Sequence, residues 1–216
     1  MSNLTLLIGN KNLSSWSLRP WIVAQHFGLP VKELKIRLDT PETYSEVKKN
    51  SPSGLVPCLM KGDLTIGDSL AIIEYFADLY PEHPIWPKDL EARARARSMA
   101  AEMHSGFSQL RGTWPMDMVN VDKSLTCPPG VAKDLKRIHT LWSDAFAKKT
   151  EDGPFLFGPF GAVDAMFAPV VSRIRTYGPV PSFAPFADYM DTVWNLPAMK
   201  VWREGAEEEA RDGWYD

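Results

Sequence analysis

The sequence of 216 residues has only two cysteines, no long hydrophobic run and no large excess of charge of either sign. Two cysteines cannot form a disulfide framework or a four-thiolate zinc site, so Cys58 and Cys127 are expected to be reduced thiols. The four histidines do not follow H-E-x-x-H or any other ligand spacing. The sequence therefore predicts no metal site.

Membrane and nucleic-acid partners are also disfavoured. No apolar run approaches the roughly 18 residues that a membrane-spanning helix needs. The 24 basic and 27 acidic residues leave a net charge of −3, which gives no electrostatic footprint for nucleic acid. The stretch Met1–Ile8 lacks the basic region and apolar segment of a signal peptide, so we expect a cytoplasmic protein.

Aromatic residues are plentiful. The chain has 8 Trp, 10 Phe and 6 Tyr, and 44% of its residues are hydrophobic, which is enough apolar surface for a core and excludes a disordered chain. At roughly 100 to 200 residues per domain, the length fits one large domain or two small ones.

Residues 1–80 predict short elements in the order βαβαββα, forming a small α/β domain. The expected strands and helices lie, in chain order, at 4–8, 21–27 after Pro20, 32–38, 41–49, 56–60, 64–66 and 70–79. In the second strand Leu34, Ile36 and Leu38 alternate with charged residues, which predicts one buried face.

Beyond this domain the pattern becomes helical only. Three prolines within Tyr80–Pro87 predict a linker at 81–88. Apolar residues then recur at helical spacing, and we expect an all-helical domain at 89–216. Its predicted helices cover 90–110, 131–146, 165–174 and 197–211. The fold class is thus α/β followed by all-α.

Polar residues occur just before the first helix, in Ser14-Ser15-Trp16-Ser17. A hydroxyl at a helix N-terminus faces a partial positive charge that favours anions. The plain alternative is that one of these serines only caps the helix, and for this stretch taken alone we favour capping.

Two further stretches have similar ambiguity. Pro57 at the start of a strand cannot donate to the ladder, and a cis bond after Val56 would turn the N–H and C=O of Val56 outward toward an extended peptide, although only about 5 to 6% of X-Pro bonds are cis. Ser69 at a helix start could bind a carboxylate, and Asp68 could bind an ammonium group. A free α-amino acid presents both charges, whereas plain capping needs neither.

Together these stretches resemble the cytosolic glutathione transferase family, over essentially the whole chain. Ser14-Ser15-Trp16-Ser17 looks like the Ser-Ser-Cys-Ser loop of its serine-type, zeta-like branch, with Trp16 in the Cys place. Asp68-Ser69-Leu70-Ala71-Ile72 resembles the family's acidic-or-Gln, Ser, x, Ala, Ile/Leu signature. The resemblance implies a thioredoxin-like N-terminal domain followed by an all-helical domain.

A third motif lies in the helical part. Gly161-Ala162-Val163-Asp164 resembles the family's Ser/Thr-x-x-Asp capping box, with Gly161 in place of the hydroxyl residue. We expect Asp164 to be structural rather than catalytic.

The resemblance implies that glutathione is the co-substrate. Its γ-glutamyl end would bind Asp68 and Ser69, and its cysteinyl backbone would pair with Val56 ahead of Pro57. The thiol would face Ser14, with Ser15 in support.

An acceptor pocket is expected between the two domains, and an arginine there would favour an anionic acceptor such as a maleylacetoacetate-like diacid. The candidates are Trp16, Met103, Phe107, Arg111, Trp114, Arg173 and Arg175. Met and aromatic residues at helical spacing are, however, more often core than pocket. The resemblance also implies a homodimer.

Three functions remain open from the sequence. The first is glutathione activation, for conjugation to an electrophile or for maleylacetoacetate isomerase-like cis–trans isomerisation. The second is a cysteine-type thiol oxidoreductase on the same fold, which would depend on Cys58. The third is a binding protein without catalysis for glutathione, a hydrophobic ligand or a protein partner.

Overall fold

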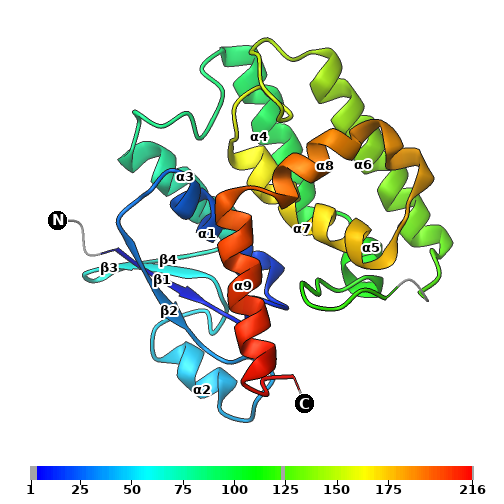
Figure 1. The fold of residues 1–216 in the computed structure, drawn as a ribbon. Helices are drawn as coiled ribbons and strands as arrows, with labels where there is room; N and C mark the ends of the chain where they lie inside the picture. The colour runs from blue at the N-terminus through cyan, green and yellow to red at the C-terminus, as the bar shows by residue number, and fades with distance from the viewer. Residues whose placement is uncertain (1–3, 123–124, 216) are drawn as a thin grey trace. The chain divides into compact units, whose positions relative to one another are not determined.

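The computed structural model describes residues 4–122 and 125–215, which form two compact units (Figure 1). One comprises Met1–His83 together with Pro197–Asp216, and the other comprises Pro84–Leu196. The last helix therefore belongs to the first unit, because it packs against the first helix of the chain. This differs from the division drawn from the sequence, which assigned 197–216 to the helical domain.

The first unit has the expected βαβαββα order, followed by one additional helix, and its thioredoxin-like fold is confirmed. Its elements are β1 (Leu4–Ile8), α1 (Ser15–His26), β2 (Val31–Lys35), α2 (Thr43–Lys48), β3 (Cys58–Lys61), β4 (Leu64–Gly67), α3 (Ser69–Leu79) and α9 (Pro197–Arg211). The sheet order is β2-β1-β3-β4, with β2 parallel to β1 and with β3 antiparallel to both β1 and β4.

Strand β1 lies inside the sheet and is covered on both faces. α1 and α3 lie over one face of the sheet and α2 lies over the other (Figure 1). Leu7 packs with Val47 of α2 and with Cys58 of β3 in one buried cluster. A strand buried on both sides needs a continuous apolar run rather than alternation, which explains the sequence Leu-Thr-Leu-Leu-Ile.

Strand β2 is shorter than its sequence pattern predicts. It ends at Lys35, and Leu34 is 37% exposed. The N–H of Ile36 still donates to the Ile8 carbonyl at 2.9 Å, but the N–H of Leu38 donates to the side chain of Asn10 at 2.6 Å, so the chain has left the ladder there. Leu38 then covers Gly9, where a Cβ atom would lie 2.4 Å from Leu38 Cδ1. The alternation from 34 to 38 therefore does not reflect one continuous buried face.

The second unit is helical. Its elements are α4 (Leu90–Ser105), α5 (Ser108–Thr113), α6 (Pro129–Ala147), α7 (Ala162–Tyr177), a short 3₁₀ helix (Pro181–Phe186) and α8 (Ala187–Trp194). The 3₁₀ helix and α8 were not predicted from the sequence. Among the residues that the structure describes, no helix is long and apolar enough to cross a membrane.

The predicted helix over 90–110 is broken in two. Phe107 has a left-handed conformation with φ of 57°, which ends the helical path after α4. Arg111 stabilises the break, because its Nη1 donates to the carbonyls of His104 and Gly106 at 3.2 and 2.9 Å. These bonds satisfy acceptors at the C-terminal end of α4 that have no partner within the helix.

Asp164 anchors the start of the buried helix α7. Its two carboxylate oxygens accept the N–H groups of Leu156 and Gly161 at 3.1 and 3.0 Å. Burial raises the pKa of Asp164 from 3.8 to about 7. The carboxyl group thus ties the loop before α7 to the helix, which supports the structural role expected for it.

Asp164→Ala should lower the free energy of unfolding by about 2 to 6 kcal/mol, because two buried N–H groups lose their acceptor at about 1 to 3 kcal/mol each. The folded state retains a proton that the unfolded state has lost between pH 3.8 and about 7. Wild-type stability should therefore fall relative to the variant as pH rises through that window.

Urea unfolding at pH 5 and pH 7.5 tests both expectations, with the exposed Asp152→Asn as control. Equal stability of Asp164→Ala and wild type, or a difference between them that is independent of pH, would contradict this role of Asp164.

Candidate functional site

Ser14 caps α1 and is nearly buried, with 7% of its surface exposed. Its hydroxyl donates to Ser17 Oγ at 2.7 Å and accepts the N–H of Ser17 at 3.4 Å. Ser17 Oγ also accepts the N–H of Gly9 at 3.1 Å. The Ser14 hydroxyl thus has the capping role that was the alternative interpretation of this stretch, and Ser17 is its partner.

Helix α1, which follows Ser14, carries the positive charge of Arg19. Ser15, at the first turn of α1, is 8% exposed. One turn further, Arg19 is buried, and its guanidinium lies 4.2 Å from the ring centroid of the half-buried Trp16. Such a cation–π contact holds the ring and the charge together on one helix face. Arg19 was not predicted as a site residue, although its i,i+3 spacing from Trp16 places the two side chains together.

The Val56–Pro57 peptide bond is cis. The β3–β4 ladder begins one residue later, at the pair Cys58↔Gly67. In the described part of the chain, neither the N–H nor the C=O of Val56 forms a backbone hydrogen bond. The polar backbone atoms of Val56 therefore lie beyond the sheet ladder.

Asp68 and Ser69 form the start of α3. Asp68 has φ of 76°, which is unusual for a residue other than glycine, and its Oδ1 accepts the N–H groups of Leu70 and Ala71 at 2.8 and 3.3 Å. The Asp68 carbonyl accepts the N–H of Ile72. Asp68 is thus an N-cap that remains exposed to solvent.

Ser69 is different, because its hydroxyl is buried without a hydrogen-bond partner among the described residues. Nor does its backbone N–H bond to another described residue. Buried polar groups in folded proteins are nearly always hydrogen-bonded, so an unsatisfied hydroxyl at a helix N-terminus requires an explanation. A bound anion would supply one.

Sheet register brings these stretches together. Leu7 pairs with Cys58, and Cys58 pairs with Gly67, so the end of β1, the start of β3 and the end of β4 lie at one end of the sheet (Figure 1). The loop to Ser14 follows β1, Val56 precedes β3 and Ser69 follows β4. Three polar stretches far apart in the sequence thus converge at this end.

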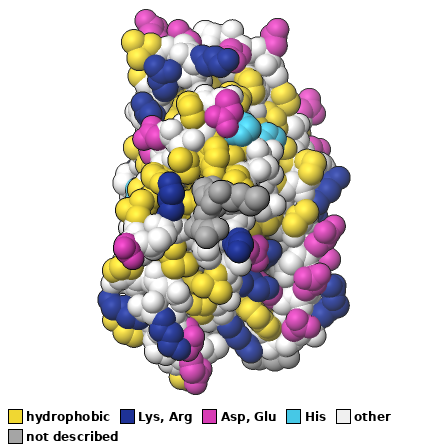
Figure 2. All heavy atoms as spheres, turned by 90° about the vertical axis from the view of Figure 1, so that its left-hand side faces the viewer, with side chains coloured by type: hydrophobic (Ala, Val, Ile, Leu, Met, Phe, Trp, Pro, Cys, Tyr) yellow, Lys and Arg dark blue, Asp and Glu magenta, His cyan; other side chains and the backbone are white. Residues whose placement is uncertain are grey.

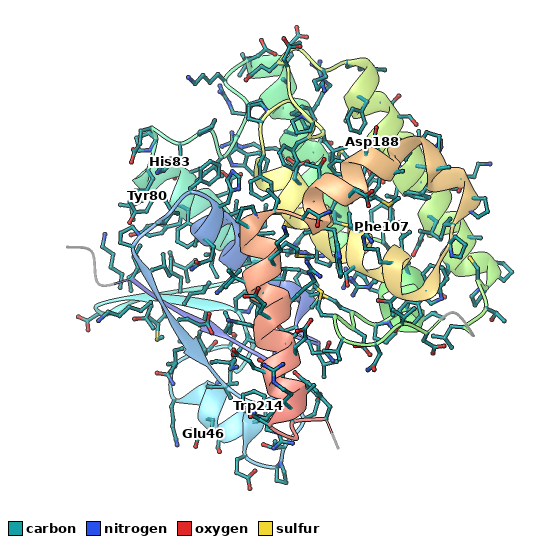
Figure 3. All side chains as sticks on the ribbon, in the orientation of Figure 1. Glu46, Tyr80, His83, Phe107, Asp188 and Trp214 are labelled. Carbon is teal, nitrogen blue, oxygen red and sulfur yellow. The ribbon has the colours of Figure 1, made fainter. Side chains whose placement is uncertain are left out.

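The predicted acceptor residues of the helical unit are mostly core. Met103 is 0% exposed and Trp114 2%. Trp114 stacks on Tyr177 with ring centroids 5.4 Å apart, and its Nε1 donates to the Thr126 carbonyl at 3.2 Å. Phe107, in the break between α4 and α5, is also buried (Figure 3). These placements agree with the core interpretation of such side chains.

The candidate arginines bind to other parts of the helical unit. Arg173 is buried and donates to the carbonyls of Trp114 and Pro169 at 2.7 and 3.1 Å, and burial lowers its pKa to about 10. Arg175 forms an ion pair with Asp191. Arg111, as described above, binds the end of α4, and burial lowers its pKa as well.

Cys58 is poorly suited to nucleophilic chemistry. It is 0% exposed, its Sγ lies 3.7 Å from the Asn50 carbonyl, and burial raises the pKa of its thiol. A raised pKa reduces the thiolate fraction that would react. Cys127 is exposed.

Residues 4–122 and 125–215 contain no group of three or more His, Cys, Asp or Glu that could hold a metal ion. On the face in Figure 2, basic and acidic side chains are interspersed among hydrophobic ones.

The chain is similar in sequence and in fold to known proteins. Residues 13–79 match the model of the glutathione S-transferase N-terminal domain. Residues 13–79 are thus similar to the N-terminal domain of the glutathione S-transferases. Its N-terminal part is zeta-like: 68 residues are 52% identical to glutathione S-transferase Z1 of Arabidopsis thaliana, over 31% of each chain.

Two further matches extend the likeness. A probable maleylacetoacetate isomerase of Caenorhabditis elegans is 30% identical over 106 residues, 49% of each chain. The crystal structure of a glutathione transferase homologue from Burkholderia, with bound glutathione, has a TM-score of 0.71 and 20% identity, over 96% of this chain and 99% of that one. The chain spans about a third of the length of the first relatives it matches in sequence.

Ser69→Ala should leave the free energy of unfolding of the ligand-free protein unchanged or raise it by about 1 kcal/mol, because it removes a buried hydroxyl that has no partner. The matched control is Ser51→Ala, since Ser51 is equally buried but bonds to Ser53 Oγ at 3.0 Å and should cost about 1 kcal/mol. Urea unfolding of both variants checks this. A loss at Ser69 as large as that at Ser51 would contradict it.

Proposed function

We propose that this protein is a glutathione transferase that activates the glutathione thiol. The activated sulfur would attack an electrophile, either to form a conjugate or to add and leave again with cis–trans isomerisation. The observation that carries the proposal is the convergence of Ser14, Val56 and Ser69 at one end of a thioredoxin-like sheet. The zeta-class and isomerase names of the relatives support the same reading.

In the proposed complex the tripeptide lies along this end of the sheet. Its γ-glutamyl carboxylate bonds to the Oγ and N–H of Ser69, and Asp68 faces the ammonium group. Pairing of the cysteinyl backbone with Val56, ahead of Pro57, extends the sheet. Support for this comes from the hydroxyl and N–H of Ser69 and from the N–H and C=O of Val56, for which the described residues offer no hydrogen-bond partner.

Ser14 would stabilise the thiolate. A free thiol has a pKa of about 8.5, and a decrease of about two units requires roughly 2.7 kcal/mol. A hydrogen bond to a charged group supplies about 1.5 to 3 kcal/mol, and the N-terminus of α1 up to about 1 kcal/mol. To donate to sulfur, the Ser14 hydroxyl must leave Ser17 Oγ, which keeps its bond from Gly9. Ser15, next along α1, is the proposed second donor.

Trp16 is half-buried on α1 and offers an aromatic surface to an acceptor. An acceptor site also drawing on Phe107, Arg111 or Arg175 would require these side chains to exchange their present contacts for the acceptor. We further propose a homodimer in the cytoplasm, as is typical of the family.

Ser14→Ala should lower kcat/KM by about 10- to 150-fold, the equivalent of losing about 1.5 to 3 kcal/mol of thiolate stabilisation. Both a chlorinated aromatic and maleylacetone should be assayed as acceptors. Ser15→Ala should have a smaller effect, and the exposed Ser45→Ala none. Unchanged activity of Ser14→Ala in both assays would refute the serine mechanism.

Two other outcomes would favour the other functions. Loss of activity in Cys58→Ser with full activity in Ser14→Ala would indicate a thiol oxidoreductase. Glutathione binding without turnover of any acceptor would indicate a binding protein.

Ser69→Ala should also weaken glutathione binding, with the dissociation constant rising by about 10- to 150-fold because a charge-assisted hydrogen bond to the carboxylate is lost. Titration calorimetry with reduced glutathione measures this. An affinity equal to that of wild type would show that the carboxylate binds elsewhere.

A further inference from the structure

The last helix is fixed to the loop before Ser14 by one buried carboxylate. Glu209 of α9 is 1% exposed. Its Oε1 accepts the N–H of Lys11 at 2.9 Å, and its Oε2 accepts the N–H of Asn12 at 3.2 Å. Two successive backbone amides of the β1–α1 loop are thus held by a residue almost 200 positions away in the chain.

The charge of Glu209 is well compensated. Lys35 Nζ lies 3.0 Å from Oε1, and the hydroxyl of Tyr215 donates to Oε2. Burial and the nearby Glu209 raise the pKa of Tyr215 above its usual value, which keeps that hydroxyl a donor. A carboxylate surrounded by four donors can remain buried as an anion, because its lost hydration is replaced.

The side chain of Lys11 fits against the same helix. A Cβ atom at Gly205 would lie 2.6 Å from Lys11 Cδ, so only glycine leaves room for the side chain as it stands. Lys11 Nζ then reaches Glu33 at 3.0 Å and lies 5.0 and 5.7 Å from the ring centroids of Trp21 and Trp202. Backbone and side chain of this loop are therefore both shaped by α9.

The residues after α9 also contact the region of β2. Arg37 Nη2 donates to the carbonyls of Gly213 and Trp214 at 3.1 and 2.9 Å. Lys35 Nζ lies 4.6 Å from the ring centroid of Trp214, which follows the C-terminal end of α9 (Figure 3). These contacts hold α9 next to β2 and so fix the position of the helix that carries Glu209.

The held loop leads directly to the cap of α1. The carbonyl of Asn10 accepts the N–H of Ser14 at 2.8 Å, and the side chain of Asn10 accepts the N–H of Leu38. Residues 10 to 12 thus connect to Leu38 on one side and to Glu209 on the other. A displacement of these residues would move the acceptor of the Ser14 N–H.

We infer that Glu209 is a positioning residue, which holds the β1–α1 loop so that the Ser14 hydroxyl is directed at the glutathione sulfur. The inference rests on the proposed function, since it concerns the serine assigned there. A misplacement of about 1 Å at a reacting group can cost about 100-fold in rate, so a residue that never touches the substrate can control the reaction.

Glu209→Gln tests this in the full-length protein, with Glu208→Gln as the matched control, because Glu208 is an exposed neighbour on the same helix. The amide of Gln has one oxygen, so it cannot accept the N–H groups of Lys11 and Asn12 on two separate oxygens as Glu209 does. Hydrogen exchange at Lys11, Asn12 and Ser14 should therefore accelerate at least about 10-fold in Glu209→Gln. With glutathione, kcat should fall by about 10- to 100-fold with little change in KM, and the pH profile of kcat/KM should shift to higher pH.

Glu209→Asp provides a second variant in case Gln in this position prevents folding. It retains the charge on a shorter side chain, and both readouts should lie between those of wild type and Glu209→Gln. Unchanged exchange at the three amides, or a lower melting temperature with wild-type kcat and pH profile, would overturn the positioning role. Absence of glutathione binding by wild type would instead refute the proposed function. The two failures can be distinguished, because hydrogen exchange measures the protection of the loop amides without glutathione.

Discussion

The pairing of β1 with β3, and of β3 with β4, is the constraint on which the site depends. Leu7, Cys58 and Gly67 lie side by side in the sheet, so whatever follows β1, precedes β3 or follows β4 must lie at one end of it. β1 is apolar and is covered on both faces, so its packing holds it inside the sheet, between β2 and β3. Convergence of the polar stretches is thus a consequence of packing.

The two serines of the site differ in their hydrogen bonding. Ser14 has a partner in Ser17, whereas the hydroxyl of Ser69 is buried without one among the described residues. Binding would complete the hydrogen bonds at α3 but would require Ser14 to change partners at α1. Ser69 would therefore contribute chiefly to affinity and Ser14 chiefly to thiol activation, while Glu209 of α9 holds the loop between β1 and Ser14.

The order of elements in the first unit could be predicted because its turn and cap signals are local, as at Asp68-Ser69. The end of β2 could not, because Leu38 leaves the ladder to bond to Asn10, a contact 28 positions away in the chain. The role of Glu209 could not be predicted either, because its hydrogen-bond partners are also distant in the chain. Nothing in the sequence of a charged helix indicates that one of its acidic residues binds two backbone amides near the N-terminus. Arginines at helical spacing likewise do not reveal whether they bind a ligand or a carbonyl, as Arg173 does.

The most direct test of the central claim is a pH titration of the thiol of glutathione bound to the wild-type protein, followed by the ultraviolet absorbance of the thiolate. The account predicts a thiol pKa about two units below the value of about 8.5 for a free thiol, with the decrease largely lost in Ser14→Ala. A bound thiol that titrates near about 8.5 in both proteins would contradict it.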